Sequence, residues 1–219
     1  GEVKFVVNGT SASPLVLDLD DNHHVTSARS ASYPFQLVPG TPTALKGWVS
    51  PADAFLVRDL NGNHRIDNGA ELFGVGTQLP SGDTAQDGFQ ALKALDSNGD
   101  GRIDAADTAF AELAVWQDGN GNGVTDAGEL LSLAERQITA LRLNPHAGSL
   151  VENGHTQGLV SAYETDDGQS HDLVDVFFQA LSGSEALVAA AQQLMPSAAT
   201  GADLLNALRD AGLGPTQVE

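Results

Sequence analysis

Three short stretches of the chain carry side-chain oxygens at a spacing that suits the binding of a hard cation. They span residues 59–71, 96–107 and 118–129, and each repeats Asp or Asn at alternate positions before ending on a carboxylate. Calcium takes six to eight oxygen ligands at about 2.3–2.6 Å, so a loop around one ion must turn an oxygen inward at every second residue. This spacing is typical of EF-hand-type loops and predicts calcium binding.

The ligands of such a loop come from positions 1, 3, 5, 9 and the last position, and position 7 contributes its backbone carbonyl. In the first loop these residues are Asp59, Asn61, Asn63, Arg65, Asp67 and Glu71. In the second loop they are Asp96, Asn98, Asp100, Arg102, Asp104 and Asp107. In the third loop they are Asp118, Asn120, Asn122, Val124, Asp126 and Glu129.

The three loops match the pattern to different degrees. Position 6 must turn sharply at positive φ, which costs glycine nothing; Gly101 and Gly123 meet this need, whereas the first loop has His64 there. Glu71 stands one residue late, and Asp107 is shorter than the usual closing glutamate. We therefore rank the second loop first, the third next and the first last. The alternative for any one loop is an Asn/Asp/Gly surface turn without metal.

A fourth acidic stretch begins the same pattern without completing it. Positions 1, 3 and 5 are occupied by Asp18, Asp20 and Asn22. His23 replaces the turn glycine, and no closing carboxylate follows, so this is either a weak fourth metal site or a polar turn. The pair His23 and His24 suggests a transition metal, but adjacent side chains of an extended chain point apart, which favours solvated histidines.

Composition limits the classes of partner. The chain has 29 Asp and Glu residues against 10 Lys and Arg, a net charge of −19, so nucleic acid and anionic membranes are poor partners. Three bound Ca²⁺ ions would reduce −19 to −13, and because clustered like charges oppose folding, we expect stability to depend on calcium. The absence of cysteine excludes disulfides and thiolate chemistry, and no apolar run is long enough to span a membrane.

The elements around the loops predict an α+β fold, with short strands at both ends and EF-hand-like calcium loops and short helices between them. Strands are predicted over 54–57 before the first loop and over 114–116 before the third. Helices are predicted over 86–95, 105–113 and 128–136, so only the second loop is a helix–loop–helix. Further strands are expected at 3–7, after Pro14, and at 35–38, 138–143, 158–163 and 173–178, the last two forming a hairpin.

Three parts follow along the 219 residues: an N-terminal flanking strand (1–13), a calcium-binding module (14–178) and a helical C-terminal extension (179–219) with helices at 184–195 and 202–211. The chain opens abruptly on Gly1 without a visible signal peptide, which indicates a piece of a longer protein.

Several short sequence segments, in the order in which they follow one another along the chain, resemble the self-processing module of iron-regulated RTX (repeat-in-toxin) proteins. They lie at residues 14–20, 47–53, 59–63, 66–74, 94–101 and 115–118. The resemblance covers roughly 14–178 and implies a secreted or cell-surface bacterial protein. It also implies a calcium-triggered break of an Asp-Pro bond at the start of the module. In that family the aspartate attacks its own carbonyl through a five-membered ring, and the resulting anhydride is captured by a lysine amine.

The decisive position differs here, because Ser13 stands before Pro14 and the chain has no Asp-Pro pair. A serine hydroxyl attacks the carbonyl of the preceding residue, Ala12, which would not release Pro14. The residues at the family junction, Ser13 and Pro14, therefore include no catalytic residue in this sequence, which favours a protein that is not an enzyme.

Three functions compete. The first is a calcium-folded, non-cleaving module of an exported RTX-type protein. It would hold two or three Ca²⁺ ions, or four if the N-terminal acidic stretch also binds one, with a Kd on the order of 10⁻⁴–10⁻³ M. Its partners would be the other domains of a larger exported protein. The second is autocatalytic cleavage at 13/14 with transpeptidation to a lysine. The third, a sensor with an exposed apolar groove, is disfavoured by the single methionine.

Overall fold

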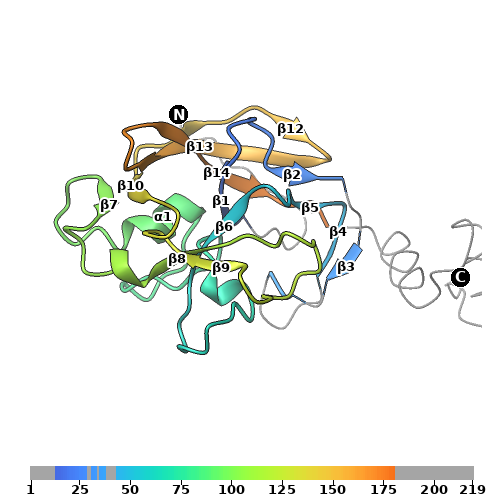
Figure 1. Ribbon diagram of the computed structural model, residues 1–219, viewed down its shortest axis with the longest axis horizontal. Helices are drawn as coiled ribbons and strands as arrows, with labels where there is room; N and C mark the ends of the chain where they lie inside the picture. Colours follow the sequence, from blue (N-terminus) through green and yellow to red (C-terminus); the bar gives the residue numbers. More distant parts are fainter. Residues whose placement is uncertain (1–12, 29–30, 34, 38–42, 181–219) are drawn as a thin grey trace, which may run out of the picture.

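The computed structural model describes residues 13–28, 31–33, 35–37 and 43–180, and an antiparallel sheet forms its framework (Figure 1). The strand order is β7-β10-β13-β14-β1-β6-β8-β9, and β11 and β12 also pair with β13. The strands of this sheet are β1 (Leu15–Leu17), β6 (Ala54–Arg58), β7 (Arg102–Asp104), β8 (Leu113–Trp116), β9 (Leu130–Ser132), β10 (Ile138–Arg142), β11 (His146–Ala147), β12 (Val151–Glu152), β13 (His155–Thr165) and β14 (Ser170–Phe177).

Four shorter strands form two pairs beside this sheet. β2 (Thr26–Ser27) pairs with β5 (Trp48–Val49), and β3 (Ala31–Tyr33) pairs with β4 (Thr43–Leu45). Helical structure in the described residues consists of α1 (Gly88–Lys93) and two 3₁₀ turns, η1 (Gly69–Glu71) and η2 (Phe110–Glu112). None of the described helices has the length and apolar character to cross a membrane.

The predicted α+β class is wrong, because the described chain is mostly β. The helix predicted over 86–95 shortens to α1, and that over 105–113 becomes turns followed by η2. The segment 128–136 forms β9 and turns, since Gly128 adopts φ 88° and β9 pairs with β8. Short apolar runs fit helix and strand equally well in sequence, and here strand pairing satisfies the backbone. The second loop is therefore not a helix–loop–helix.

Most predicted strands of the central region are present. The hairpin of β13 and β14 turns at Gly168 with φ 81°, as expected. Of the strand predicted over 35–38, the described residues 35–37 form a single bridge, between Gln36 and Asn68. The strand at 3–7 and the helices at 184–195 and 202–211 lie outside the described residues.

The sheet is covered on both faces, which explains why β6 is a continuous apolar run. Phe55 and Val57 join an aromatic cluster with Trp48 and Trp116. Leu56 faces the other cluster, where α1 contributes Phe89 and Leu92 and the second loop contributes Ile103.

The strands position the acidic loops directly. The first loop follows β6, and the third loop begins two residues after the end of β8. Position 8 of the third loop, Thr125, accepts the Ile66 N–H at 3.0 Å and donates to its carbonyl at 3.3 Å, so these two loops are linked. The second loop contains β7, in which Ile103 pairs with Leu141 of β10.

Candidate metal centre and junction

The first aspartate of each loop accepts backbone N–H groups from across the turn. Gly62 and His64 donate to Asp59, both at 2.8 Å. His64 adopts φ 60°, so it takes the left-handed conformation that glycine usually provides here. These hydrogen bonds lower the pKa of Asp59 although burial opposes the change. The first loop therefore tolerates its unusual residue at position 6.

The second and third loops repeat this arrangement with glycine at position 6. Gly99 and Gly101 donate to Asp96 at 2.8 and 3.0 Å. In the third loop Gly123 donates to Asp118 at 2.8 Å. Asp118 is fully buried and also accepts the Trp48 indole N–H at 2.7 Å, which connects this loop to the aromatic core.

The closing carboxylates bind the same two backbone positions, 2 and 9, in all three loops. Leu60 and Asp67 donate to Glu71 at 3.1 and 2.7 Å, Ser97 and Asp104 to Asp107 at 2.7 and 3.1 Å, and Gly119 and Asp126 to Glu129 at 3.1 and 2.9 Å. The turn η1 brings Glu71 into place from its late position. The sequence differences that separated the loops therefore do not change how they close.

The remaining side chains converge on the middle of each loop. The amides of Asn61 and Asn63 donate to Asp67 at 2.8 Å and lower its pKa, and Asn120 and Asn122 do the same for Asp126. In the second loop Asn98 donates to Asp100 at 3.0 Å.

The side chain at position 7 of the second loop points away from the loop, as expected for a residue that offers only its carbonyl. Arg102 pairs with Glu164 of β13 at 2.6 Å. The three loops gather carboxylate and side-chain amide groups, and a hard cation such as calcium prefers the oxygens of such groups.

The N-terminal acidic turn, residues 18–24, closes in a way that its sequence does not reveal. His23 at φ 64° and Asn22 donate to Asp18 at 2.7 and 3.2 Å, as in the other loops. Asp53, which precedes β6, accepts the N–H of Leu19 at position 2 at 2.9 Å. Asp53 therefore occupies the place of the missing closing carboxylate.

Oxygen atoms of Asp18, Asp20 and Asp53 lie within 4.8 Å of one another. Asp18 and Asp53 are fully buried, and Oδ2 of Asp53 has no hydrogen-bond partner among the described residues. Burial raises the pKa of Asp53 to about 6 and also raises that of Asp18. A nearby cation would offset this cost of burying two carboxylates.

The two adjacent histidines bind different carboxylates. His23 contacts Asp172 at 2.9 Å, and His24 contacts Glu152 at 2.8 Å. Asp172 raises the pKa of the exposed His23 imidazole. His23 lies near Asp18 as well as Asp172, but the two imidazoles do not form a common site.

The junction between Ser13 and Pro14 is buried. The Pro14 carbonyl accepts the N–H of Val176 on β14 at 3.1 Å, and the Ser13 hydroxyl accepts the N–H of Val75 at 3.3 Å. A Cβ on Gly74 would lie 2.8 Å from the Ser13 carbonyl oxygen, so only glycine allows this close approach. The junction is thus held between β14 and residues 73–75.

Asp175 of β14 lies beside this junction, and sequence reasoning missed it. Its Oδ2 accepts the N–H of Gly88 at 3.0 Å, and the Ser13 hydroxyl interacts with the same carboxyl group. The available signal was a lone carboxylate in the apolar run from Leu173 to Phe178.

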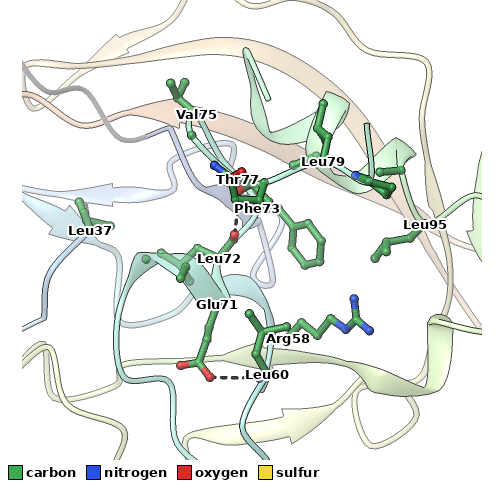
Figure 2. Close-up of a pocket in the computed structure, with 17 residues that line it drawn as sticks. Leu37, Arg58, Leu60, Glu71, Leu72, Phe73, Val75, Thr77, Leu79 and Leu95 are labelled. Carbon is green, nitrogen blue, oxygen red and sulfur yellow. Dashed lines mark hydrogen bonds between the residues drawn. The ribbon is translucent and has the colours of Figure 1, made fainter. Parts of the chain in front are cut away.

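A cavity of about 630 Å³ lies next to the first loop (Figure 2). Its lining is mostly apolar and includes Leu60, Leu72, Val75 and Leu79. Glu71 reaches it from the first loop, but both of its oxygens already accept backbone N–H groups. The cavity therefore adds no ligand to the loop.

Comparison with known proteins places these features in a family. Residues 15–179 match the SPM domain. The chain is 44% identical over 175 residues to Iron-regulated protein FrpA of Neisseria meningitidis serogroup C, in an alignment that covers 76% of this chain. The chain spans only 15% of that relative, in which the matched region is one module of a larger protein. This chain therefore belongs to the SPM domain family, the self-processing modules of iron-regulated, RTX-related bacterial proteins.

Proposed function

We propose that this domain is a calcium-folded structural module that keeps the peptide bond before Pro14 intact. The observation that carries this proposal is the repeated closure of the acidic loops. In all three, one carboxylate binds the backbone at positions 2 and 9 while the first aspartate binds the opposite turn. The same geometry with Asp53 makes the N-terminal acidic turn a fourth candidate site.

Bound calcium would supply positive charge to groups that otherwise repel one another. Asp59, Asp67, Asp107 and Asp126 have lowered pKa values, so they are ionised at neutral pH. The third loop would transmit this stabilisation to the core through Asp118 and the Trp48 indole. Thr125 would extend it to the first loop.

The junction supports a non-cleaving module on chemical grounds. Attack of the Ser13 hydroxyl on its own carbonyl would close a strained four-membered ring, whereas an aspartate closes a five-membered ring. Ser13 is also engaged by Val75 and Asp175. The bond to Pro14 thus lacks the carboxylate that the family reaction needs.

Export follows from the same proposal. The resemblance to RTX proteins implies a secreted or cell-surface location, and loops of this kind in extracellular modules bind calcium with a Kd on the order of 10⁻⁴–10⁻³ M. Such a module would stay unfolded where the calcium concentration is low and would fold outside the cell. Its partners would be the neighbouring domains of a larger protein.

The second candidate function is calcium-triggered cleavage at 13/14 despite the serine, followed by transfer to a lysine. The burial of the junction against Asp175 favours it, because a water-excluded site beside an acid suits bond breakage. The missing carboxylate at residue 13 outweighs this feature.

A calcium titration of the chain, followed by near-UV circular dichroism and intact mass, tests the proposal. We expect tertiary signal to appear as calcium rises through the 10⁻⁴–10⁻³ M range, with the mass unchanged. Magnesium is the matched control, because it demands octahedral geometry at about 2.0–2.1 Å and should fold the chain poorly. Full structure in chelator would contradict calcium-dependent folding, and loss of residues 1–13 would favour the second function.

A further inference from the structure

A carboxyl group that none of the acidic loops uses lies against the junction. Asp175 is fully buried on β14, and its Oδ1 has no hydrogen-bond partner among the described residues. A buried carboxylate with one oxygen that lacks a partner is costly, so such a group is retained as a neutral acid or serves a function.

The strand register fixes where this group lies. Asp175 pairs with Leu15 of β1, while the next residue, Val176, binds the Pro14 carbonyl. The Asp175 carboxyl interacts with Ser13 from its place opposite Leu15, two residues further along the chain. The carboxyl group therefore lies next to Ser13, the residue whose carbonyl forms the peptide bond to Pro14.

The start of α1 holds the group in place. The Gly88 N–H donates to Oδ2 at 3.0 Å, and a Cβ on Gly88 would lie 2.7 Å from Leu15 Cγ and 2.8 Å from the Phe73 carbonyl oxygen. Only glycine lets the helix approach β1 closely enough for this hydrogen bond.

The surroundings favour the protonated form of the acid. Burial raises the pKa of Asp175 well above its usual range, and Asp87 at the N-terminus of α1 adds to the effect. The Gly88 N–H and the Ser13 hydroxyl act in the opposite direction. The other elements around it, β1 and residues 73–75, carry no ionisable side chain.

We propose that Asp175 is the proton donor for cleavage at this junction, and that Ser13→Asp alone restores calcium-dependent cleavage before Pro14. This inference rests on the proposed function, in which the serine at residue 13 prevents the family reaction. It adds that the other groups needed for cleavage, with Asp175 as the acid, are still in place.

A carboxylate at residue 13 attacks the carbonyl carbon of the same residue and forms a C–O bond, which closes a five-membered anhydride. The C–N bond to Pro14 breaks, and the Asp175 O–H gives its proton to the proline nitrogen, which leaves as a secondary amine. Asp175 becomes a carboxylate, so the net charge is unchanged. Water or a lysine amine then opens the anhydride.

The test compares Ser13→Asp with the double variant Ser13→Asp/Asp175→Asn. Asparagine keeps an acceptor for the Gly88 N–H but cannot act as an acid. With calcium present, Ser13→Asp should release residues 1–13, and the double variant should do so at least ~100-fold more slowly, within the range of general acid catalysis. Asp166→Asn, an exposed aspartate in the β13–β14 turn, is the matched control and should leave the rate unchanged.

A pH profile separates proton donation from a merely structural role. The Ser13→Asp rate should fall tenfold per pH unit above the pKa of the acid, and the residual rate of the double variant should lack this decline. Equal rates for the two variants would overturn the proposal, as would a folded, calcium-bound Ser13→Asp that stays intact. If Asp175→Asn does not fold, the pH profile of Ser13→Asp decides alone, and a flat profile refutes the donor. Failure of the proposed function would appear instead in the unaltered chain, as absent calcium binding or lost mass.

Discussion

The third acidic loop and the N-terminal acidic turn hold their first aspartate alike but obtain the closing carboxylate differently. In the third loop Glu129 binds a backbone N–H only 10 residues away in sequence. In the N-terminal turn Asp53 binds the equivalent N–H across 34 residues. The first closure depends on local chain geometry, and the second depends on β1 and β6 being neighbours in the sheet.

This difference separates two kinds of candidate site. A locally closed loop can form its ligand set before the sheet is complete, whereas the N-terminal turn forms its set only when the sheet has formed. Calcium at the three loops should therefore drive folding, and calcium at the N-terminal turn should report that folding is complete.

Removal of calcium should produce the largest effect. At a calcium concentration 100-fold above Kd, each ion contributes about 2.7 kcal/mol, so four ions contribute on the order of 10 kcal/mol to the free energy of unfolding. We expect urea unfolding in chelator to show a loss of this size or no folded baseline. Equal unfolding midpoints with calcium and with chelator would show that the loops do not drive folding.

Substitution within the loops should reveal the extra role of the buried third loop. Asp118→Ala removes one ion and also the buried hydrogen bond between Asp118 and the Trp48 indole, for a loss of about 4–5 kcal/mol in calcium. Asp59→Ala is the matched control, since its carboxylate binds only its own loop, and should lose about 2.7 kcal/mol. Urea unfolding followed by tryptophan fluorescence measures both, and equal losses would show that the Trp48 contact contributes nothing.

Acid should weaken the sheet rather than the loops, through His155 at the start of β13. Burial lowers the pKa of His155 to about 4, below its unfolded value of 6.5. The neutral ring therefore contributes stability above pH 6.5 that is lost as the pH falls toward 4, by about 3 kcal/mol.

His155→Gln should flatten this part of the pH dependence, because glutamine does not titrate and keeps an acceptor for the Gln179 N–H. Urea unfolding between pH 4 and pH 7 measures the difference. His146→Gln, on an exposed strand, is the control. An unchanged slope in His155→Gln would mean that other groups set the acid response.

Asp53→Asn should give the smallest effect and tests the long-range closure directly. Asparagine keeps the acceptor for Leu19 but removes the charge, so we expect one fewer calcium ion and a loss of about 2.7 kcal/mol in calcium. In chelator the variant should be at least as stable as the parent, because a buried carboxylate has been removed. An unchanged calcium count would assign Asp53 a purely structural role.

The features that could be predicted from the sequence are the acidic loops, because their geometry depends on the spacing of residues that are close together in the chain. Residues 59–71 and 118–129 close on themselves, so their alternating oxygens indicated the loop geometry without a fold. Asp53 could not be found because its position beside Asp18 depends on the order of β1 and β6. Asp175 was hidden for the same reason, since only the pairing of β14 with β1 brings it to Ser13.

The helix predictions were wrong for a different reason. Segments such as 128–136 combine helix-forming residues with an apolar stripe, and nothing local shows that β8 offers a free edge to pair with. The contact between the first and third loops is a similar case, because the Thr125 hydroxyl binds the Ile66 backbone across the fold. Tertiary pairing decided both cases.

Native mass spectrometry of the chain in calcium, followed by its denatured mass, is the most direct test of the central claim. A calcium-folded, non-cleaving module should carry four calcium ions, lose one of them in Asp53→Asn, and keep the full mass of 219 residues after prolonged incubation. A chain that folds without calcium, or that loses residues 1–13 when calcium is added, would contradict the claim.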